Sequence, residues 1–378
     1  MAVGDIFKGN PSTFVDRESG YTILKPISQD QNRQMYFTSN PFTKEGDELI
    51  FSAVRNGVED YYRLNYTTGE YVQLTDIASR NSGSDTDIQF YVNAHFDKNR
   101  DTLFYAEPNK FYSVNIRTLE TKLVYESPGR LHSLSPTCDG KYIVSCDSQP
   151  VIRYNNDRQE LNLTFYRMFK IDIATGEETT ILYRNFPFYH LQCSPTDPEL
   201  IMYCAWGFQC THQRIWYANI DGSKGGPLGP ELPNEHRTHE YFTPDGKQVA
   251  YHGKFFSFDN KANFKNINHT WGIMDADGTN DKYWSCLPRG KQAGHSIVSH
   301  DGKMFVADGD GYISYVRLHD DGTATFEPIV AHNSTMSGNF VHPHPSFSND
   351  DRYVIYATDS GGKDKGNIYM VDLKSKTN

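Results

Sequence analysis

The sequence predicts an all-β protein, a seven-bladed β-propeller whose last blade is closed by a strand from the N-terminus. Two observations lead to this prediction. A short turn, usually Asp-Gly, introduces an apolar strand repeatedly along the chain, at intervals of about 40 to 58 residues. A second recurring strand follows in each unit and ends in a polar turn, and no stretch shows a convincing helical period. Units of this length made of short strands are typical of propeller blades.

Seven turns mark the start of the recurring strands, and the second of them is degenerate. They are Gly46-Asp47, Asn99-Arg100, Asp139-Gly140, Asp197-Pro198, Asp245-Gly246, Asp301-Gly302 and Asp350-Asp351. The strands after them are short and rich in aromatic and β-branched residues, which indicates antiparallel sheet. We expect one domain over residues 1–378, with blades at about 37–80, 90–127, 131–184, 188–230, 237–286, 293–333, and 340–374 plus 16–27.

The two ends of the chain are expected to meet in the last blade. Residues 16–24 have the pattern of a turn and an outer strand whose own inner strands are missing, and residues 368–373 end the last unit without an outer strand. Pairing these two segments would leave no open sheet edge. An N-terminal strand is therefore predicted to complete the ring.

Two polar segments interrupt the repeating pattern. The longest insertion, residues 255–268, is polar enough to form a surface loop. The run Asp-Gly-Asp-Gly at residues 308–311 resembles part of a calcium-binding loop, but the later ligands are absent. We therefore expect a hairpin turn there.

Composition and charge exclude several classes of protein. Of 378 residues, 37% are hydrophobic and 14% aromatic, which is enough for a large core, and the net charge of −10 argues against nucleic acid as a partner. The N-terminus lacks the basic and apolar regions of a signal peptide, and no apolar run is long enough to cross a membrane. The six cysteines contain no CxxC pair and are expected to be reduced core thiols. These features predict a cytoplasmic protein without a membrane partner, and a homodimer is one candidate for its assembly.

Five histidines precede their turns by seven or eight residues in consecutive units. They are His132, His190, His239, His295 and His344. The innermost strand of a propeller blade runs along the central channel, so residues at one place of the repeat would ring one mouth of that channel. A single histidine of this kind is more often a buried residue bonded to nearby backbone. Five in register favour a metal or proton-transfer site.

The densest group of candidate ligands is the pair His342 and His344. In an extended strand, residues two apart point to the same side, so both imidazoles can bind one metal ion. His295 from the neighbouring blade would add a third imidazole, and Asn339 would add an oxygen donor. This donor set suits Mn²⁺, Zn²⁺, Ni²⁺ or Fe²⁺ rather than Ca²⁺.

Several stretches of the sequence together resemble the oligogalacturonate lyase family, polysaccharide lyase family 22. They are residues 190–202 (HLQCSPTDPELIM), 213–216 (QRIW) with 221–223 (DGS), 238–240 (THE) before 243–246 (TPDG), and 342–348 (HPHPSFS). The resemblance extends over nearly the whole chain. It implies a seven-bladed propeller that cleaves short oligogalacturonides, the breakdown products of pectin, by β-elimination with a divalent metal of the manganese type.

The resemblance also implies the metal ligands and the base. His295, His342 and His344 would bind the metal, and Asn339 stands where the family usually has a glutamine ligand. His239 would remove the C5 proton of the uronate as general base. A neutral imidazole with a pKa near ~6.5 is suited to that step at cytoplasmic pH.

Substrate binding is expected to involve Arg214, His190 and Trp206. The resemblance implies that Arg214 holds the substrate carboxylate, and the metal and this arginine would stabilise the charge that develops when the C5 proton leaves. The C4 oxygen would then depart, giving a 4,5-unsaturated uronate and from it 5-keto-4-deoxyuronate. Trp206 would stack on a sugar ring, although core packing is the commoner role of such aromatic residues.

Two other functions stay open at this point. The first is a related propeller lyase acting on another uronate-containing oligosaccharide, an alternative favoured by Asn339 and by the insertion at residues 255–268. The second is a sugar-binding or scaffold propeller without catalysis, because a fold does not fix a function. The scaffold predicts no metal and no facing imidazoles, whereas both lyases predict them.

Overall fold

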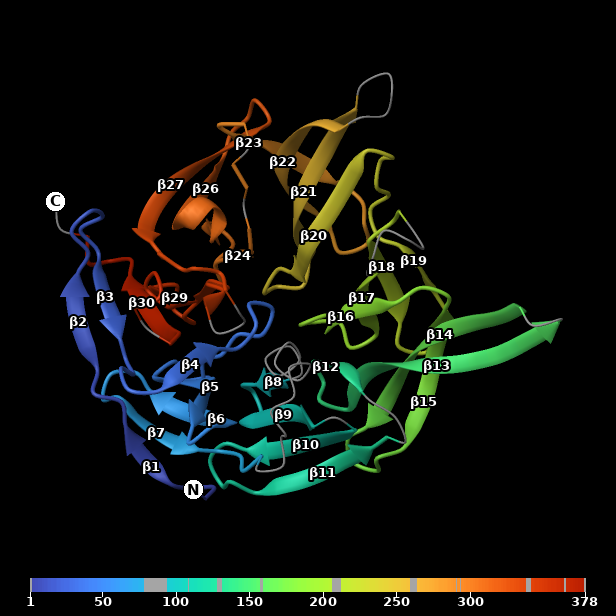
Figure 1. Cartoon of the computed structure of the whole chain (residues 1–378), viewed down its shortest axis with the longest axis horizontal. Helices are drawn as coiled ribbons and strands as arrows, with labels where there is room; N and C mark the ends of the chain where they lie inside the picture. The colour runs from blue at the N-terminus through green and yellow to red at the C-terminus, as the bar shows by residue number, and fades with distance from the viewer. Residues whose placement is uncertain are drawn as a thin grey trace.

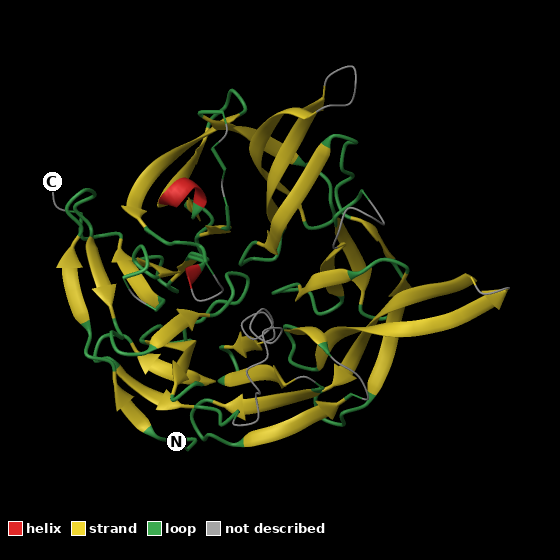
Figure 2. Ribbon diagram, viewed as in Figure 1, coloured by secondary structure: helices red, strands yellow, loops and turns green. Residues whose placement is uncertain are grey.

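Antiparallel β-strands make up the regular structure of the chain, as the repeating pattern predicts (Figure 2). The structure is a computed structural model, and it describes residues 2–77, 94–107, 109–127, 131–156, 159–205, 212–258, 264–289, 291–292, 294–337, 341–363 and 365–376. These residues contain no α-helix, and their helical structure is limited to short turns such as η1 (Gly309–Gly311). No helix among them is long and apolar enough to cross a membrane. The prediction of an all-β protein is therefore confirmed.

The described strands form six sheets, and the first four follow one another along the chain. The first sheet has the order β1 (Ile6–Lys8), β7 (Glu70–Gln73), β6 (Val58–Asn65), β5 (Glu48–Arg55), β4 (Gln31–Gln34). The second has the order β11 (Thr121–Glu126), β10 (Lys110–Asn115), β9 (Thr102–Glu107), β8 (Ala94–Asp97). The third has the order β12 (His132–Pro136), β13 (Tyr142–Asn156), β14 (Gln159–Asp172), β15 (Glu178–Arg184). The fourth has the order β16 (Phe188–Cys193), β17 (Leu200–Ala205), β18 (Ile215–Asn219), β19 (Gly225–Pro227).

The largest sheet has eight strands and consists of two antiparallel halves. One half has the order β20 (Glu235–Phe242), β21 (Gln248–Phe258), β22 (Phe264–Asp275), β23 (Lys282–Leu287). The other half has the order β27 (Thr323–Ala331), β26 (Tyr312–Leu318), β25 (Phe305–Ala307), β24 (Ser296–Val298). A parallel pairing of β23 with β27 joins the halves. Six sheets are thus described where the repeats predict seven blades.

The last sheet joins the two ends of the chain. Its order is β2 (Ser12–Val15), β3 (Thr22–Lys25), β30 (Asn367–Asp372), β29 (Tyr353–Thr358), β28 (Ser346–Phe347). The N-terminal strand β3 pairs with β30 from Thr22↔Asp372 to Leu24↔Met370, so the predicted pairing of the chain ends is confirmed. Figure 1 shows the sheets around a common centre, with the first sheet beside the last.

Buried amide side chains fasten the first sheet to the last. Nδ2 of Asn32 donates to Oδ1 of Asn367 at 2.8 Å, and Oδ1 of Asn32 accepts the backbone N–H of Ile368 at 2.9 Å. Nε2 of Gln34 donates to the carbonyl oxygen of His344 at 3.0 Å. A buried amide that loses its partner costs about 1–3 kcal/mol, so these bonds fix how the two sheets meet. We call this junction of the first and last sheets the seam.

Apolar side chains fill the space between neighbouring sheets. One cluster of fully buried residues spans the seam and includes Ile27, Phe42, Phe51, Ile355, Ile368 and Met370. Full burial of such a side chain contributes about 1.5–3 kcal/mol. The seam therefore combines apolar packing with directional hydrogen bonds.

The insertion at residues 255–268 is not the surface loop that its polar sequence predicts. Phe255 pairs with Asn268, and the antiparallel ladder of β21 and β22 continues toward the tip. Residues 259–263 at the tip lie outside the described residues. The prediction was wrong because a two-stranded extension that is partly exposed on both faces needs no continuous apolar face, so its sequence pattern resembles that of a loop.

The pairing of β3 with β30 can be tested by removing one buried side chain. Ile23 on β3 is 0% exposed, so Ile23→Ala should lower the free energy of unfolding by about 2–5 kcal/mol. Val15 on the neighbouring strand β2 is 52% exposed, and Val15→Ala should change it by no more than about 0.5 kcal/mol. Urea unfolding followed by tryptophan fluorescence measures both variants. Equal, small effects would contradict a buried N-terminal strand.

Candidate functional site

A kink in the innermost strand places the histidines of two neighbouring sheets. The pairing of β16 with β17 and of β20 with β21 is interrupted at His190 and His239, whose φ angles are 52° and 56°. Such angles are uncommon for residues other than glycine, and β-bulges near active sites often re-aim a side chain. In the third sheet the kink lies at Ser133 (φ 66°) rather than at His132. The side chain of His132 lies outside the described residues.

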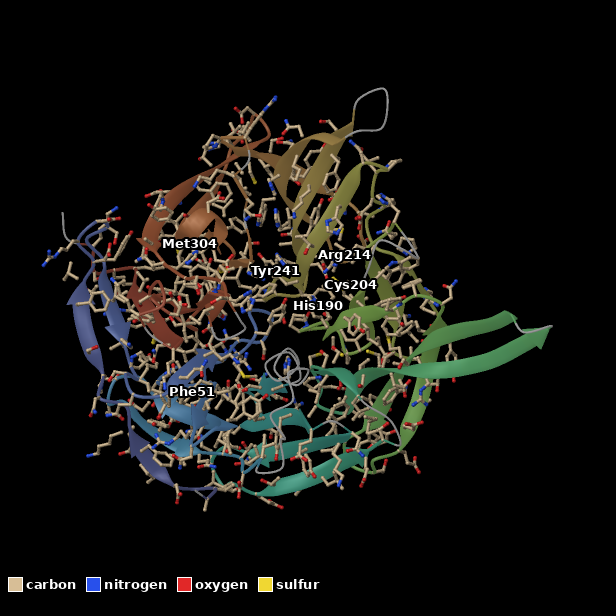
Figure 3. All side chains as sticks on the ribbon, viewed as in Figure 1. Phe51, His190, Cys204, Arg214, Tyr241 and Met304 are labelled. Atoms are coloured by element: carbon tan, nitrogen blue, oxygen red, sulfur yellow. The ribbon has the colours of Figure 1, made fainter. Side chains whose placement is uncertain are left out.

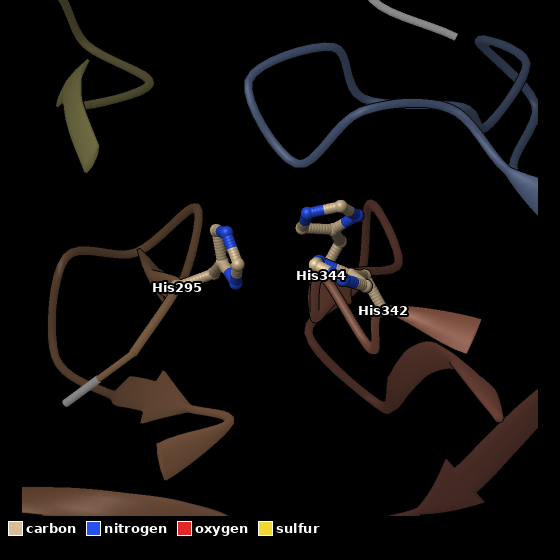
Figure 4. A group of neighbouring side chains, drawn as sticks. All are labelled: His295, His342 and His344. Atoms are coloured by element: carbon tan, nitrogen blue, oxygen red, sulfur yellow. The ribbon is translucent and has the colours of Figure 1, made fainter. Parts of the chain in front are cut away.

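Three imidazoles meet where the inner ends of the last two strand groups approach each other (Figure 4). The ring centroids of His295 and His344 are 4.2 Å apart, and those of His342 and His344 are 5.5 Å apart. One nitrogen of each ring lies within 4.8 Å of the other two. Three imidazole nitrogens this close form a donor set for a divalent transition metal. We call these residues the histidine trio; Asn339, the predicted fourth ligand, lies outside the described residues.

The extended strand that predicted the approach of His342 and His344 does not exist in the structure. Residues 341–345 form no strand, and β28 begins only at Ser346. The φ of His344 is 44°, so the backbone turns at this residue and brings the two rings together without strand alternation. The prediction of neighbouring imidazoles is confirmed, but its geometric reason was wrong.

A buried carboxylate, Asp308, supports the histidine trio from behind. Its Oδ2 accepts the Nδ1–H of His295 at 2.9 Å and the backbone N–H of His344 at 3.2 Å. Burial acts to raise the pKa of Asp308, but the adjacent His295 and its hydrogen bonds lower that pKa below the usual range. A carboxylate on Nδ1–H fixes the tautomer in which Nε2 of His295 carries the lone pair for a metal.

Glycine is required directly before His295. Gly294 has a φ of +60°, and a Cβ at this position would lie 2.2 Å from Oδ1 of Asp308. The same Oδ1 accepts the backbone N–H of His295 at 2.7 Å, so the carboxylate cannot move away without losing that bond. Asp308 also begins the segment 308–311, which connects the paired strands β25 and β26, so the predicted hairpin turn is confirmed.

His239 lies beside the histidine trio with one ring nitrogen fixed. Its Nδ1–H donates to the carbonyl oxygen of Gly294 at 3.0 Å, so Nε2 carries the lone pair. Its ring stacks on that of His295, with centroids 4.1 Å apart. Burial, His295 and His252 hold the pKa of His239 well below its usual value of 6.5, not near it as the sequence suggested. The imidazole is therefore neutral and can accept a proton.

A buried carboxylate, Glu240, holds Arg214 in place at the site. Its Nε donates to Oε2 of Glu240 at 3.0 Å, and Nδ1 of His190 lies 3.8 Å from Oε1 of Glu240, whose side chain is 0% exposed. Burial acts to raise the pKa of Glu240, but the charge of Arg214 and then His190 lower it. Among the described residues, the terminal nitrogens of Arg214 have no hydrogen-bond partner. They can therefore receive a bound anion in a forked arrangement.

A second cluster of metal-type ligands surrounds Glu240 but is better suited to anion binding. His190, Cys204 and Glu240 offer ligand atoms within 4.8 Å of one another, and Figure 3 shows His190, Cys204 and Arg214 together near the centre of the ring. Arg214 already pairs with the carboxylate, and its charge would repel a metal cation. Burial raises the pKa of the Cys204 thiol to about 12, which disfavours the thiolate that binds metals.

Two aromatic rings after β4 form the floor of the site. Tyr36 packs edge-on against the rings of His190 and His344. Phe37 packs against the rings of His239, His295 and His344. Beyond this floor lies a cavity of about 700 Å³, lined by both rings, His190 and residues near the turns. None of the histidine trio lines this cavity, whereas both rings of the floor do.

The structure brings together most of the residues that the sequence predicted for the site. They are His190, Arg214, His239, His295, His342 and His344. Trp206 and Asn339 lie outside the described residues. Sequence reasoning missed the carboxylates Asp308 and Glu240. The available signals were the position of Glu240 directly after His239 and the acidic run that begins at Asp308.

Comparisons with known proteins agree on one family. A model of the family described as oligogalacturonate lyase matches residues 1–377. The chain is 26% identical to an oligogalacturonate lyase of Dickeya dadantii (strain 3937) and 25% identical to an oligogalacturonide lyase of Pectobacterium atrosepticum, over 96% of each chain in both cases.

Two solved structures are similar over almost the whole chain. One is an oligogalacturonate lyase in complex with manganese, with a TM-score of 0.81 and 22% identity, covering 99% of this chain and 98% of the other. The other is an oligogalacturonate lyase from Vibrio parahaemolyticus, with the same TM-score and identity, covering 100% of both chains. At 22% sequence identity, this structural similarity establishes the fold alone.

The support of the histidine trio by Asp308 predicts how a substitution changes metal binding. Asp308→Asn should weaken the binding of a divalent cation by about 10–100-fold, because His295 loses the carboxylate that orients it. Asp301→Asn is the matched control, since Asp301 is exposed in a turn. Calorimetric titration with Mn²⁺ measures both proteins. Unchanged affinity in Asp308→Asn would remove Asp308 from the site.

Proposed function

The chain belongs to the oligogalacturonate lyase family, and from this premise we propose that it cleaves short oligogalacturonides by metal-dependent β-elimination. The curated relatives are lyases by name, and they match the chain over nearly its full length. The observation that carries the proposal is the stacking of a neutral base, His239, on His295 of the histidine trio. A base and a metal site in contact are what proton removal beside a carboxylate requires.

We also propose that the fold is a single seven-bladed propeller over residues 1–378. The eight-stranded sheet then counts as two blades of four antiparallel strands, joined edge to edge by β23 and β27. The last blade contains the N-terminal strands β2 and β3. Support comes from the equivalent position of the kinked inner strands in successive sheets.

His295, His342 and His344 are proposed to hold the metal. The donor set fits, because three imidazole nitrogens converge and a carboxylate orients one of them. A solved member of the family contains manganese, which supports Mn²⁺ as the ion here. Bound there, a divalent cation would neutralise the uronate carboxylate next to C5. Asn339 stays a predicted fourth ligand.

Other residues of the site are proposed to remove the C5 proton and to bind the substrate carboxylate. Nε2 of His239 is the proposed acceptor of the C5 proton, because the carbonyl of Gly294 fixes the other nitrogen as donor. The two terminal nitrogens of Arg214 are proposed to bind the substrate carboxylate, while Glu240 holds the guanidinium through Nε. Loss of the proton leads to departure of the C4 oxygen and a 4,5-unsaturated uronate. His190 lies beside the same Glu240 and is a proposed substrate contact.

An absorbance assay tests the proposed reaction. Protein loaded with Mn²⁺ is mixed with digalacturonate, and the ultraviolet absorbance of the conjugated double bond is followed. We expect absorbance to rise with time and to require the metal. Activity on another uronate disaccharide but not on digalacturonate would identify a related lyase instead. No product from any uronate, although the protein binds metal, would refute the proposed function.

Removing the proposed base should separate catalysis from metal binding. His239→Ala should lower kcat by about 10²–10⁴-fold, because it removes the proposed general base. Its affinity for Mn²⁺ should stay unchanged. His319→Ala is the control, since His319 is an exposed histidine on the outer part of its sheet. Full activity in His239→Ala would show that another residue is the base.

Removing the proposed carboxylate anchor should affect the transition state more than the metal. Arg214→Ala should lower kcat/KM by about 10²–10³-fold, the usual effect of losing one donor to a developing negative charge. Arg317→Ala is the matched control, because Arg317 on β26 forms a solvent-exposed ion pair with Glu327 on β27. Steady-state kinetics on digalacturonate compare them. Equal kinetics in the two variants would contradict the role of Arg214.

A further inference from the structure

Three basic side chains form a row across β20, β21 and β22. His236 is paired with Lys254, and Lys254 is paired with His269. Side chains of paired residues point to the same face of a sheet, with Cβ atoms about 4.5–5.5 Å apart. Beyond this row, β21 and β22 continue away from the centre of the ring (Figure 1). We call these three residues the basic row.

A buried histidine connects the basic row to the proposed base. His252 is 2% exposed, and its ring lies 6.0 Å, centroid to centroid, from that of His239. On its other side, Nε2 of His252 lies 3.2 Å from Nδ1 of His269. Its remaining nitrogen, Nδ1, is buried without a hydrogen-bond partner among the described residues. A continuous path of imidazoles therefore leads from the active site to the basic row.

The charged member of the basic row, Lys254, lacks a carboxylate partner among the described residues. Burial lowers the pKa of both His236 and His269, so these two imidazoles are neutral and Lys254 carries the charge of the row. Asp310, the carboxylate that acts on His269, is already paired with Lys291 at 3.7 Å. Burial lowers the pKa of His269, and the charge of Lys254, its cross-strand neighbour, lowers it further. An anion bound there would supply the charged partner that Lys254 lacks.

We infer that the basic row binds the carboxylate of a second uronate unit of the oligosaccharide. The inference rests on the proposed function, in which Arg214 and the histidine trio hold the carboxylate of the unit that loses its proton. A polyuronate carries one carboxylate on every sugar. Lys254 lies two residues beyond His252 on the same face of β21, so it is placed to meet the carboxylate of another unit. Lys254 supplies the permanent charge, and His236 and His269 supply donors on either side of it.

Binding measurements without turnover test this inference. Digalacturonate and monomeric galacturonate are titrated into Mn²⁺-loaded His239→Ala protein, with and without Lys254→Ala. Loss of a charged hydrogen-bond partner should weaken digalacturonate binding about tenfold or more and leave the monosaccharide unaffected. Lys254→Arg should retain most of the affinity. The matched control is Lys247→Ala at the turn before β21, where the lysine side chain is 80% exposed.

Kinetics and stability give two further readouts. In protein with His239 intact, Lys254→Ala should raise KM for digalacturonate about tenfold with little change in kcat. Its unfolding midpoint without ligand should not fall, because the substitution removes no ion pair among the described residues. A lower midpoint with parallel loss of monosaccharide binding would assign Lys254 a structural role and overturn the inference. Wild-type cleavage of digalacturonate with unchanged KM in Lys254→Ala would overturn it while leaving the proposed function intact. Failure of the wild-type protein to bind or cleave any uronate would refute both.

Discussion

The pairing of β3 with β30 is the constraint on which the site depends. It brings the first sheet against the last, and the buried amides of Asn32 and Gln34 then fix how the two meet. Gln34 donates directly to the carbonyl of His344, and Tyr36 and Phe37 follow two and three residues later on the same segment. The floor of the site and a member of the histidine trio are therefore held by the same junction. Because these residues are more than three hundred positions apart, only closure of the ring brings them together.

Two buried carboxylates position different side chains of the candidate site, a histidine and an arginine. Asp308 binds Nδ1 of His295 and orients that ring for a metal, whereas Glu240 holds Arg214 and leaves its terminal nitrogens available. A buried carboxylate is costly unless it is paired, so each fixes its cationic or donor partner firmly. His239 has neither carboxylate; its Nδ1–H meets a backbone carbonyl, and burial keeps the ring neutral. The proposed metal ligand His295 and the proposed base His239 thus differ in the hydrogen-bond partner of Nδ1, a carboxylate in one case and a backbone carbonyl in the other.

Most of the fold and part of the site could be predicted from the sequence, because turns and apolar strands recur at regular intervals. Counting residues back from the turn pointed to His132 in the third sheet, but the kinked position there is Ser133, seven residues before Gly140. In the fourth sheet the kink lies at His190, eight residues before Pro198. The turn there is one residue longer than the turn at Gly140. A one-residue difference between turns cannot be resolved by counting alone. The carboxylates Asp308 and Glu240 were missed because their partners, His295 and Arg214, are distant in the sequence. Local sequence patterns do not predict such contacts.

The central claim is that ring closure and the kinked segments assemble one metal site from His295, His342 and His344. Pulsed electron paramagnetic resonance of the Mn²⁺-loaded protein counts the imidazole nitrogens bound to the ion. The account predicts three imidazoles in the wild-type protein and two in each of His295→Ala, His342→Ala and His344→Ala, with His190→Ala unchanged. Fewer than three imidazoles in the wild-type protein, or loss of one in His190→Ala, would contradict it.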